Sequence, residues 1–422
     1  MSGILDKLLK GRDVEWFQLV QVAEYSKSRI SYDKVDEENY VGVDNLLPNQ
    51  AGKTNSNYLP KSGTLIEYVP NDILIGNIRP YLRKIWHSDR NGGTNGDVLV
   101  IRSIYNKLNP RYLYQVLSDN SFFNYNVQNS KGAKMPRGDK EAILKYLIPI
   151  PPLDVQAEIV RILDAFTAVT AELTAELNMR EKQYQYYRDK LLSFSDVGIE
   201  TDSNRQQQTA LCERLANNVK QNHQIIWKSL GELGQLIRGN GLQKSDFTET
   251  GFPAIHYGQI YTFYGTFADR TKSFVSENLA KKLKKAQNGD VLLAGTSENI
   301  QDIMKPLGWL GNEIAISGDM FAYRPNAELD TKYLTYFLQT TEFQKYKEKY
   351  AYGTKVTRLN TEKFLKFEIA VPPLEEQERI VEILDKFEAL THSITEGLPK
   401  EIALRQQQYE YYREQLLDFP KN

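Results

Sequence analysis

Residues 151–166 read PPLDVQAEIVRILDAF, and residues 372–387 read PPLEEQERIVEILDKF. Ten of these sixteen positions are identical at an offset of 221 residues. A second pair of segments, REKQYQYYRDKLLSF at 180–194 and RQQQYEYYREQLLDF at 405–419, agrees at nine of fifteen positions. Self-similarity of this kind is typical of a duplicated architecture. We therefore expect a variable block followed by a helical segment, twice over, with simple divergence after duplication as the alternative reason for the variable blocks.

Both helical segments carry apolar residues at alternating steps of four and three, which is the pattern of a heptad seam. The first seam comprises Ile159, Leu163, Phe166, Thr170, Leu173, Leu177, Arg180, Tyr184, Tyr187, Leu191 and Phe194. The second comprises Leu384, Phe387, Thr391, Ile394, Leu398, Ile402, Arg405, Tyr409, Tyr412, Leu416 and Phe419. Since both seams need a partner, we expect the two helices to pair antiparallel; the alternative is that each packs on its own domain. Two successive four-residue steps beside Gly397 and Pro399 predict a kink.

Composition limits the class of protein. With 422 residues, 41% hydrophobic and 25% charged, the chain resembles a globular protein of two to four domains. The mean hydropathy is -0.52, and no apolar run reaches the roughly 18 residues of a membrane span. The single cysteine, Cys212, indicates a reducing cytoplasm, and the four histidines show no metal-ligand spacing, so no metal site is expected.

The charge is distributed unevenly along the chain. The net charge is -1, but residues 14–150 hold 17 Lys/Arg against 14 Asp/Glu, and residues 227–371 hold 19 against 16, so each block is +3. This is a weak indication of two domains that face an anion, and ordinary surface scatter of charge is an equal alternative.

The two blocks are predicted to mix short strands with short helices, which makes the class α+β. Predicted strands are Trp16–Val22, Thr64–Val69, Asp72–Asn77, Asp97–Arg102, Gly289–Ala294, Asp319–Arg324 and Lys366–Val371. Predicted helices are Tyr112–Leu117 and Tyr333–Phe337.

Loops between these elements carry the candidate binding residues. Arg, Lys, Asn and Gln can contact base edges or phosphates, and a Gly-x-Lys-x-x-Arg loop occurs in both blocks, at 132–137 and 353–358. The candidate DNA-binding residues are Arg79, Tyr81, Arg83, Lys84, Lys131, Lys134, Arg137, Tyr257, Gln259, Ser297, Asn299, Lys355, Thr357 and Arg358. For any single basic loop, a solvated surface is the alternative.

Catalytic motifs are not found. The segment LPNQAGKT at 47–54 ends like a P-loop, but Leu47 replaces the required first glycine. Asn109-Pro110-Arg111-Tyr112 only partly matches an amino-methyltransferase motif and is better explained as a helix start. No nucleophile elbow is present, so no catalytic residue is expected.

The repeated Pro-Pro-Leu segments and the Gln-Tyr-x-Tyr-Tyr-Arg endings at 183–194 and 408–419 resemble the specificity (S) subunit of Type I restriction–modification systems. The resemblance covers nearly the whole chain. It implies two target-recognition-like α/β domains separated by two long helices in an antiparallel coiled coil with pseudo-twofold repeat. The expected divisions are an N-terminal segment at 1–13 that packs near the helices, recognition domains at 14–150 and 227–371, helical regions at 151–194 and 372–422, and a linker at 195–226. A short helix is expected in the linker around Leu211, Leu215 and Val219.

The resemblance also implies a function and partners. Each domain would read one half of a bipartite double-stranded DNA target, and the helices would set the spacing and dock two methyltransferase (M) subunits. Restriction (R) subunits would join. The chain itself would hold no cofactor, with S-adenosylmethionine in the M subunits and ATP and Mg in the R subunits. Expected docking residues are Gln156, Phe166, Tyr187, Gln377, Phe387 and Tyr412. The alternative is a coiled-coil scaffold that binds only proteins.

Overall fold

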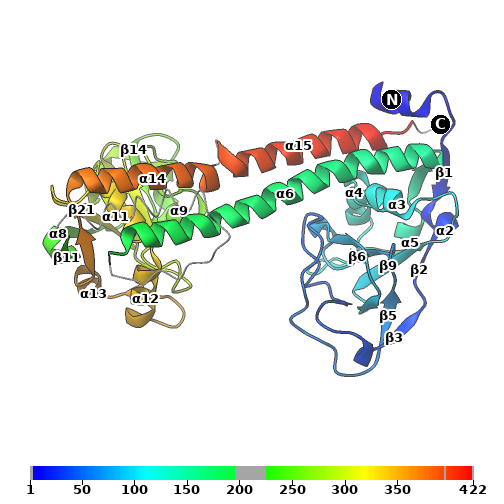
Figure 1. Cartoon of the computed structure of the whole chain (residues 1–422), viewed down its shortest axis with the longest axis horizontal. Coiled ribbons are helices and arrows are strands. Elements are labelled where there is room, and N and C mark those ends of the chain that lie inside the picture. Colours follow the sequence, from blue (N-terminus) through cyan, green and yellow to red (C-terminus); the bar gives the residue numbers. More distant parts are fainter. Residues whose placement is uncertain (1–2, 195–224, 394–395, 421–422) are drawn as a thin grey trace, which may run out of the picture. The chain divides into compact units, whose positions relative to one another are not determined.

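The computed structural model describes residues 3–194, 225–393 and 396–420. The chain forms two compact units: unit 1 contains residues 1–172 and 403–422, and unit 2 contains residues 173–402. Each unit holds one globular domain of short strands and helices together with part of the long helices (Figure 1). The predicted α+β class is therefore confirmed. The short helix expected around Leu211 lies outside the described residues.

Unit 1 contains three sheets. In the two-stranded sheet, β1 (Glu15–Gln18) pairs antiparallel with β10 (Leu147–Ile150). One four-stranded sheet has the order β2 (Ala23–Tyr25), β9 (Val98–Ser103), β6 (Ile73–Gly76), β7 (Ile85–His87), and the other has the order β3 (Arg29–Ser31), β5 (Thr64–Tyr68), β8 (Gly92–Thr94), β4 (Tyr40–Val41). The helices of this unit are α1 (Gly3–Leu9), α2 (Leu19–Val22), α3 (Pro110–Leu117), α4 (Asn120–Gln128) and α5 (Lys140–Leu144), with 3-10 turns η1 (Tyr32–Lys34) and η2 (Pro80–Leu82).

Unit 2 has the same plan, but its two main sheets contain five strands each instead of four. Its first strand, β11 (Ile226–Ser229), pairs with its last, β24 (Glu368–Val371). One five-stranded sheet has the order β12 (Gly234–Arg238), β21 (Met320–Pro325), β18 (Val291–Ala294), β19 (Pro306–Trp309), β15 (Phe267–Ala268). The other has the order β13 (Phe247–Thr248), β16 (Ser273–Val275), β14 (Phe252–Ile255), β20 (Ile314–Ile316), β17 (Lys285–Ala286), and β22 (Ala351–Tyr352) pairs with β23 (Arg358–Leu359). The shorter helices are α8 (Leu230–Leu233), α9 (Tyr257–Thr262), α10 (Glu277–Ala280), α11 (Thr331–Phe337), α12 (Thr341–Tyr350) and α13 (Thr361–Leu365), with η3 (Lys244–Asp246).

The strand predictions mostly match the structure, but Trp16–Val22 was predicted as one strand and that is wrong. The strand ends at Gln18, and α2 follows as a single helical turn. Leu19 and Val22 lie three residues apart and are both buried. One helical turn places both side chains on the same face, whereas a strand would turn them to opposite faces. Unit 2 has the same strand-to-turn junction between β11 and α8.

The first long helix, α6 (Leu153–Leu192), is continuous over 40 residues, which is roughly 60 Å. Its first part belongs to unit 1, where α15 (Gly397–Leu417) lies beside it (Figure 1). The rings of Phe166 and Tyr412 are stacked with centroids 5.1 Å apart, and Leu416 shares a buried cluster with Ile159. Because contacts advance along α15 as they retreat along α6, the two helices are antiparallel here.

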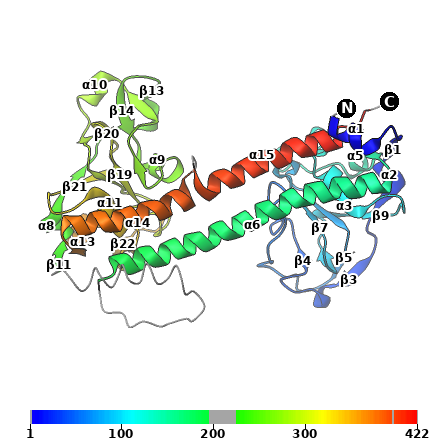
Figure 2. The ribbon, with the colours of Figure 1, turned by 45° about the horizontal axis from the view of Figure 1, so that its top comes forward.

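The second part of α6 belongs to unit 2, where it lies beside α14 (Leu374–His392) (Figure 2). Tyr187 stacks on Phe387 at 5.6 Å, and Tyr184 contacts His392 at 5.5 Å, so this pair is also antiparallel. The predicted pairing of the two seams is therefore confirmed within each unit.

The second helical segment is not one kinked helix, as predicted, but two helices. α14 ends at His392 and α15 begins at Gly397, whose φ of +77° is in the left-handed region. A Cβ atom at Gly397 would lie 2.4 Å from the carbonyl oxygen of Ala389, so only glycine fits. Pro399 falls in the first turn of α15, where a missing N–H is tolerated. Ile394, expected on the seam, lies outside the described residues.

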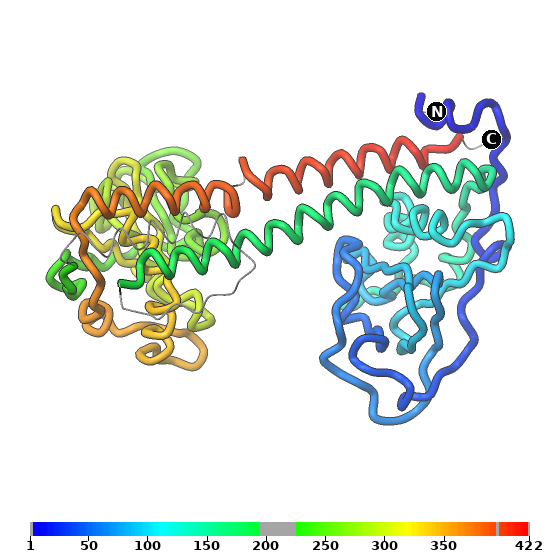
Figure 3. The backbone as a smooth tube through the Cα atoms, viewed as in Figure 1, coloured from blue at the N-terminus to red at the C-terminus, as the bar shows by residue number. Residues whose placement is uncertain are grey.

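The N-terminal helix packs against the end of the second helical segment within unit 1 (Figure 3). Leu5 and Leu9 of α1 are buried in the same cluster as Leu416 and Phe419. The indole nitrogen of Trp16 also donates to the carbonyl oxygen of Pro420 at 3.2 Å. The two ends of the described chain are therefore held in one core.

No helix among residues 3–194, 225–393 and 396–420 has the length and apolar character required to cross a bilayer.

Burial of His87 predicts an acid-sensitive unit 1. His87 ends β7 and packs against Tyr114 of α3, and burial, followed by the charge of Arg111, lowers its pKa from 6.5 to about 4. Between these two values the unfolded chain binds the proton and the folded chain does not, so stability falls as the pH drops from 6.5 towards 4. We expect His87→Phe, which keeps a ring against Tyr114, to lose the part of the pH dependence of stability that comes from His87. Denaturation midpoints at pH 7 and pH 5 measure it; an equal pH dependence in both proteins would contradict the prediction.

Candidate nucleic-acid interface

Two predicted loops of unit 1 that are far apart in sequence form one surface. Residues 77–84 follow the buried strand β6, and residues 130–138 follow α4. The amide of Arg79 donates to the carbonyl oxygen of Pro136 at 2.7 Å, and that of Gly138 donates to the carbonyl oxygen of Asn77 at 3.1 Å. Lys131 and Arg137 exchange two backbone hydrogen bonds of 2.8 Å. We call residues 77–84 and 130–138 loop pair 1.

Side chains on loop pair 1 fall into two groups. Arg83 donates to Asn120 at 2.7 Å, Lys84 donates to the carbonyl oxygen of Val43 at 2.7 Å, and two of the three cations of the second loop form ion pairs. Those pairs are Lys131–Asp139 at 2.5 Å and Arg137–Asp97 at 3.2 Å. By contrast, the side chains of Arg79, Tyr81 and Lys134 are exposed, and among the described residues they have no hydrogen-bond or ionic partner. These three are the side chains most available to a ligand.

The backbone of residues 79–83 is held in an unusual conformation. Arg79 and Arg83, on either side of η2, both have positive φ, 53° and 51°. Non-glycine residues pay of order 1 kcal/mol or more for this region, and such strain is typical of functional loops. The amides of Asn49 and Gln50 donate to the carbonyl oxygens of Leu82 and Arg83, at 2.9 and 3.0 Å, and so hold the loop in place.

Unit 2 presents an equivalent loop pair, residues 295–304 and 352–359, which we call loop pair 2. Ser297 and Thr357 exchange backbone hydrogen bonds of 3.1 and 2.7 Å. Gly353 has a φ of 102°, and its counterpart Gly132 in unit 1 has a φ of 100°. The Gly-x-Lys-x-x-Arg loop therefore makes the same turn in both units, beside the loop that follows a central buried strand.

The candidates of unit 2 are not all equally exposed. Lys355, Arg358 and Asn299 are exposed, Ser297 is half-buried, and Thr357 is buried. Tyr257 and Gln259 lie on α9, where the side chain of Gln259 caps the helix by accepting from the amide of His256 and donates to Ser273. α9 contacts loop pair 2 through the hydroxyl of Tyr261, which donates to the carbonyl oxygen of Thr296.

Arg238 and Tyr352 were not among the predicted candidates, but they lie beside one of them. Both line a small cavity of about 170 Å³ together with Arg358. Arg238 is exposed at the end of β12, and Tyr352 is 56% exposed.

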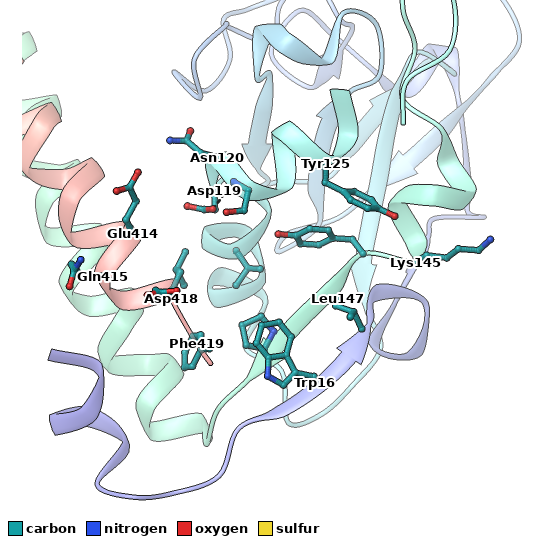
Figure 4. A pocket seen from close by; sticks show the side chains of 15 residues that line it. Trp16, Asp119, Asn120, Tyr125, Lys145, Leu147, Glu414, Gln415, Asp418 and Phe419 are labelled. Carbon is teal, nitrogen blue, oxygen red and sulfur yellow. Dashed lines mark hydrogen bonds between the residues drawn. The ribbon is translucent and has the colours of Figure 1, made fainter. Parts of the chain in front are cut away.

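A larger cavity lies elsewhere. It measures about 630 Å³ and sits in unit 1 between α4 and the end of α15, where Asp119, Asn120, Glu414 and Asp418 line it (Figure 4). None of the predicted DNA-binding residues borders it. No group of His, Cys, Asp and Glu within the described part of the chain is arranged to hold a metal ion.

The expected docking residues lie inside the units. Phe166 stacks on Tyr412 and Tyr187 on Phe387, so these four aromatic side chains hold the antiparallel helices to each other. The side chains of Gln156 and Gln377 are fully buried. Any part that Gln156 and Gln377 play in docking a partner would therefore be indirect.

Two similar α+β domains, each with the same paired loops and each joined to antiparallel helices, define a duplicated recognition protein. A family model, the type I restriction modification DNA specificity domain, matches residues 11–180 and 226–404. The specificity subunit of the type I restriction enzyme EcoR124I/EcoR124II of Escherichia coli is 32% identical over 99% of this chain and 97% of its own length. The chain therefore belongs to the type I restriction–modification specificity subunits and has two target recognition domains.

Solved structures agree on the fold. A chain from a study of complex assembly and conformational transition of the type I R-M system superposes with a TM-score of 0.59 at 18% identity, covering 96% of this chain and 98% of that one. The S subunit from M. genitalium superposes with a TM-score of 0.52 at 15% identity, covering 97% of each chain.

Proposed function

We propose that loop pair 1 and loop pair 2 each read one half of a bipartite target in double-stranded DNA. The observation that carries this is the repetition of one presentation on both units: a strand-following loop bonded to a Gly-x-Lys-x-x-Arg turn, with exposed cations. Exposed Arg and Lys neutralise phosphates and can contact guanine edges. The sequences of the two loop pairs differ, so the two half-sites differ.

The long helices have two roles in this proposal. α6 is uninterrupted from unit 1 into unit 2, so it sets the separation of the half-sites. The helical regions dock two methyltransferase subunits, and restriction subunits join the same complex. Exposed apolar side chains on α6, Val169 and Met179, are available for such contacts.

The chain itself performs no chemistry in this proposal. Catalysis resides in the partners: the methyltransferase subunits hold S-adenosylmethionine, and the restriction subunits hold ATP and Mg. The complex acts in the cytoplasm, on DNA.

The test removes the exposed cations of one loop pair. We expect Arg79→Ala combined with Lys134→Ala to weaken target binding by the complex with methyltransferase subunits about 10- to 100-fold near physiological salt, because two counterion-releasing contacts are lost. The slope of log affinity against log salt should also become shallower. Titration of labelled target DNA at several salt concentrations measures both quantities.

Lys34→Ala, an exposed lysine of unit 1 outside loop pair 1, is the control and should change neither quantity. Unchanged affinity in the double variant would contradict the assignment of loop pair 1. A wild-type complex without preference for any DNA over random competitor would instead favour a scaffold that binds only proteins.

A further inference from the structure

Gln50 touches both the recognition loop and the long helix in unit 1. Its amide donates to the carbonyl oxygen of Arg83 at 3.0 Å, so it helps to hold the strained turn of loop pair 1. Its side-chain oxygen accepts from Nη1 of Arg413 on α15 at 2.7 Å. Its side-chain nitrogen donates to the carbonyl oxygen of Ser118, between α3 and α4, at 2.6 Å. One residue therefore joins three elements.

Arg413 is a buried cation with few partners. It is 2% exposed, lies over the ring of Tyr409 at 5.0 Å, and approaches the carboxylate of Asp119 at 3.7 Å. Its Nε atom has no hydrogen-bond partner among the described residues. A buried guanidinium is expensive unless its contacts are held in place. Displacement of α15 would therefore disturb Gln50 and Asp119 directly.

A second route connects the same elements. Asp119 caps the N-terminus of α4, and the next residue, Asn120, accepts from the guanidinium of Arg83 at 2.7 Å. Figure 4 shows Asp119 and Asn120 at the start of α4, facing the end of α15 that carries Glu414. The turn at residues 79–83 is thus tied to α15 through Gln50 and through the start of α4.

We propose that Gln50 and Arg413 are positioning residues that make the geometry of loop pair 1 depend on the seating of α15. This rests on the proposed function, in which loop pair 1 reads one half-site. The position of α15 and the conformation of loop pair 1 are then coupled. Discrimination between DNA sequences at that half-site therefore changes when the contacts that position α15 change.

Unit 2 uses different residues for the same connection. The buried amine of Lys347 on α12 donates to the carbonyl oxygen of Gln301, within loop pair 2, at 2.6 Å. The amide of Thr341, which begins α12, donates to Asp189 of α6 at 3.2 Å. Because the residues differ, a substitution can remove the hydrogen bonds of one connection and leave those of the other unchanged.

The experiment compares Gln50→Met and Lys347→Met in the complex with methyltransferase subunits. Methionine keeps the length of each side chain and removes its hydrogen bonds. For Gln50→Met we expect discrimination against mismatches in one half-site to relax about 3- to 30-fold, with discrimination in the other half-site and assembly unchanged. Lys347→Met should relax the opposite half-site. Competition binding with single-mismatch targets measures both.

A second variant tests whether a folding defect, and not the lost hydrogen bond, explains the result. Arg413→Lys keeps the buried charge near Asp119 but cannot reproduce the guanidinium bond to Gln50, so it should relax the same half-site as Gln50→Met. Combining the two should add little, because they cut one connection. Equal loss at both half-sites, or no change at either, would overturn the inference while leaving the proposed function intact. A wild-type complex with no target preference would overturn the proposed function itself.

Discussion

Replacing Gln377 with leucine is expected to destabilise unit 2 by about 2–5 kcal/mol, since three backbone groups, one buried and two partly buried, lose their partners at about 1–3 kcal/mol each, less some relaxation and hydration. The side-chain oxygen of Gln377 accepts from the amide of Asp330 at 2.8 Å. Its nitrogen donates to the carbonyl oxygens of Glu328 and Pro372, both at 2.9 Å. These bonds join the start of α14 to the loop that leads into α11.

Unit 1 contains the same arrangement of hydrogen bonds around a buried glutamine. Gln156 accepts from the amide of Asn109 at 2.8 Å and donates to the carbonyl oxygens of Lys107 and Pro151, at 2.9 and 2.7 Å. Gln156→Leu should therefore destabilise unit 1 in the same way as Gln377→Leu destabilises unit 2. Each variant should leave the other unit unaffected if the units unfold independently.

Hydrogen exchange read by peptide separates the two units. Peptides from α11 and α14 should lose protection in Gln377→Leu, and peptides from α3 and the start of α6 in Gln156→Leu. The control is Gln185→Leu, an exposed glutamine on α6, which should change stability by no more than about 0.5 kcal/mol. Full protection in Gln377→Leu would show that the buried bonds are dispensable.

These glutamines illustrate what the sequence could predict. The repeat places a glutamine at the same position of both helical segments, and a shared role was a sound inference from it. The sequence could not show what this role is, because a repeated polar residue can either face a partner protein or form hydrogen bonds with buried backbone groups. Only the burial and the backbone partners distinguish the two.

The pairing of the long helices was predictable for a physical reason. Two stripes with the same heptad pattern each need a partner, and the stacks Phe166–Tyr412 and Tyr187–Phe387 satisfy both. The end of α14 at His392 was not predictable, since nothing at that position breaks a helix; the clash that excludes a side chain at Gly397 comes from the preceding turn.

The candidate interface was predictable in outline only. The repeated Gly-x-Lys-x-x-Arg motif located one loop of each pair, and both glycines adopt positive φ. The sequence could not show that Arg83, Lys84 and Lys131 are engaged within the protein, because their partners Asn120, Val43 and Asp139 are distant or unremarkable residues. Arg238 was missed because a single basic residue on a strand has no distinctive pattern.

Loss of Arg324 is expected to destabilise unit 2 by about 3–5 kcal/mol, because it leaves a buried carboxylate without its counter-ion. Asp290 is 1% exposed and accepts two hydrogen bonds of 2.8 Å from the guanidinium of Arg324. Among the described residues, the only other hydrogen bond to this carboxylate comes from the amide of Gln287, at 2.8 Å. A single N–H group cannot replace the lost charge, so Arg324→Met should be severe.

The charge, and not the packing, should account for this loss, and a double variant separates the two. Arg324→Met combined with Asp290→Asn removes both charges but keeps an acceptor for the amide of Gln287, so most of the stability should return. Asp72 and Arg102 form the equivalent pair in unit 1, at 2.9 and 2.6 Å, and Arg102→Met with Asp72→Asn should behave alike. Chemical denaturation of the single and double variants measures the recovery. If the double variant is as unstable as Arg324→Met, the methylene stem of the arginine, and not its charge, stabilises the central sheet.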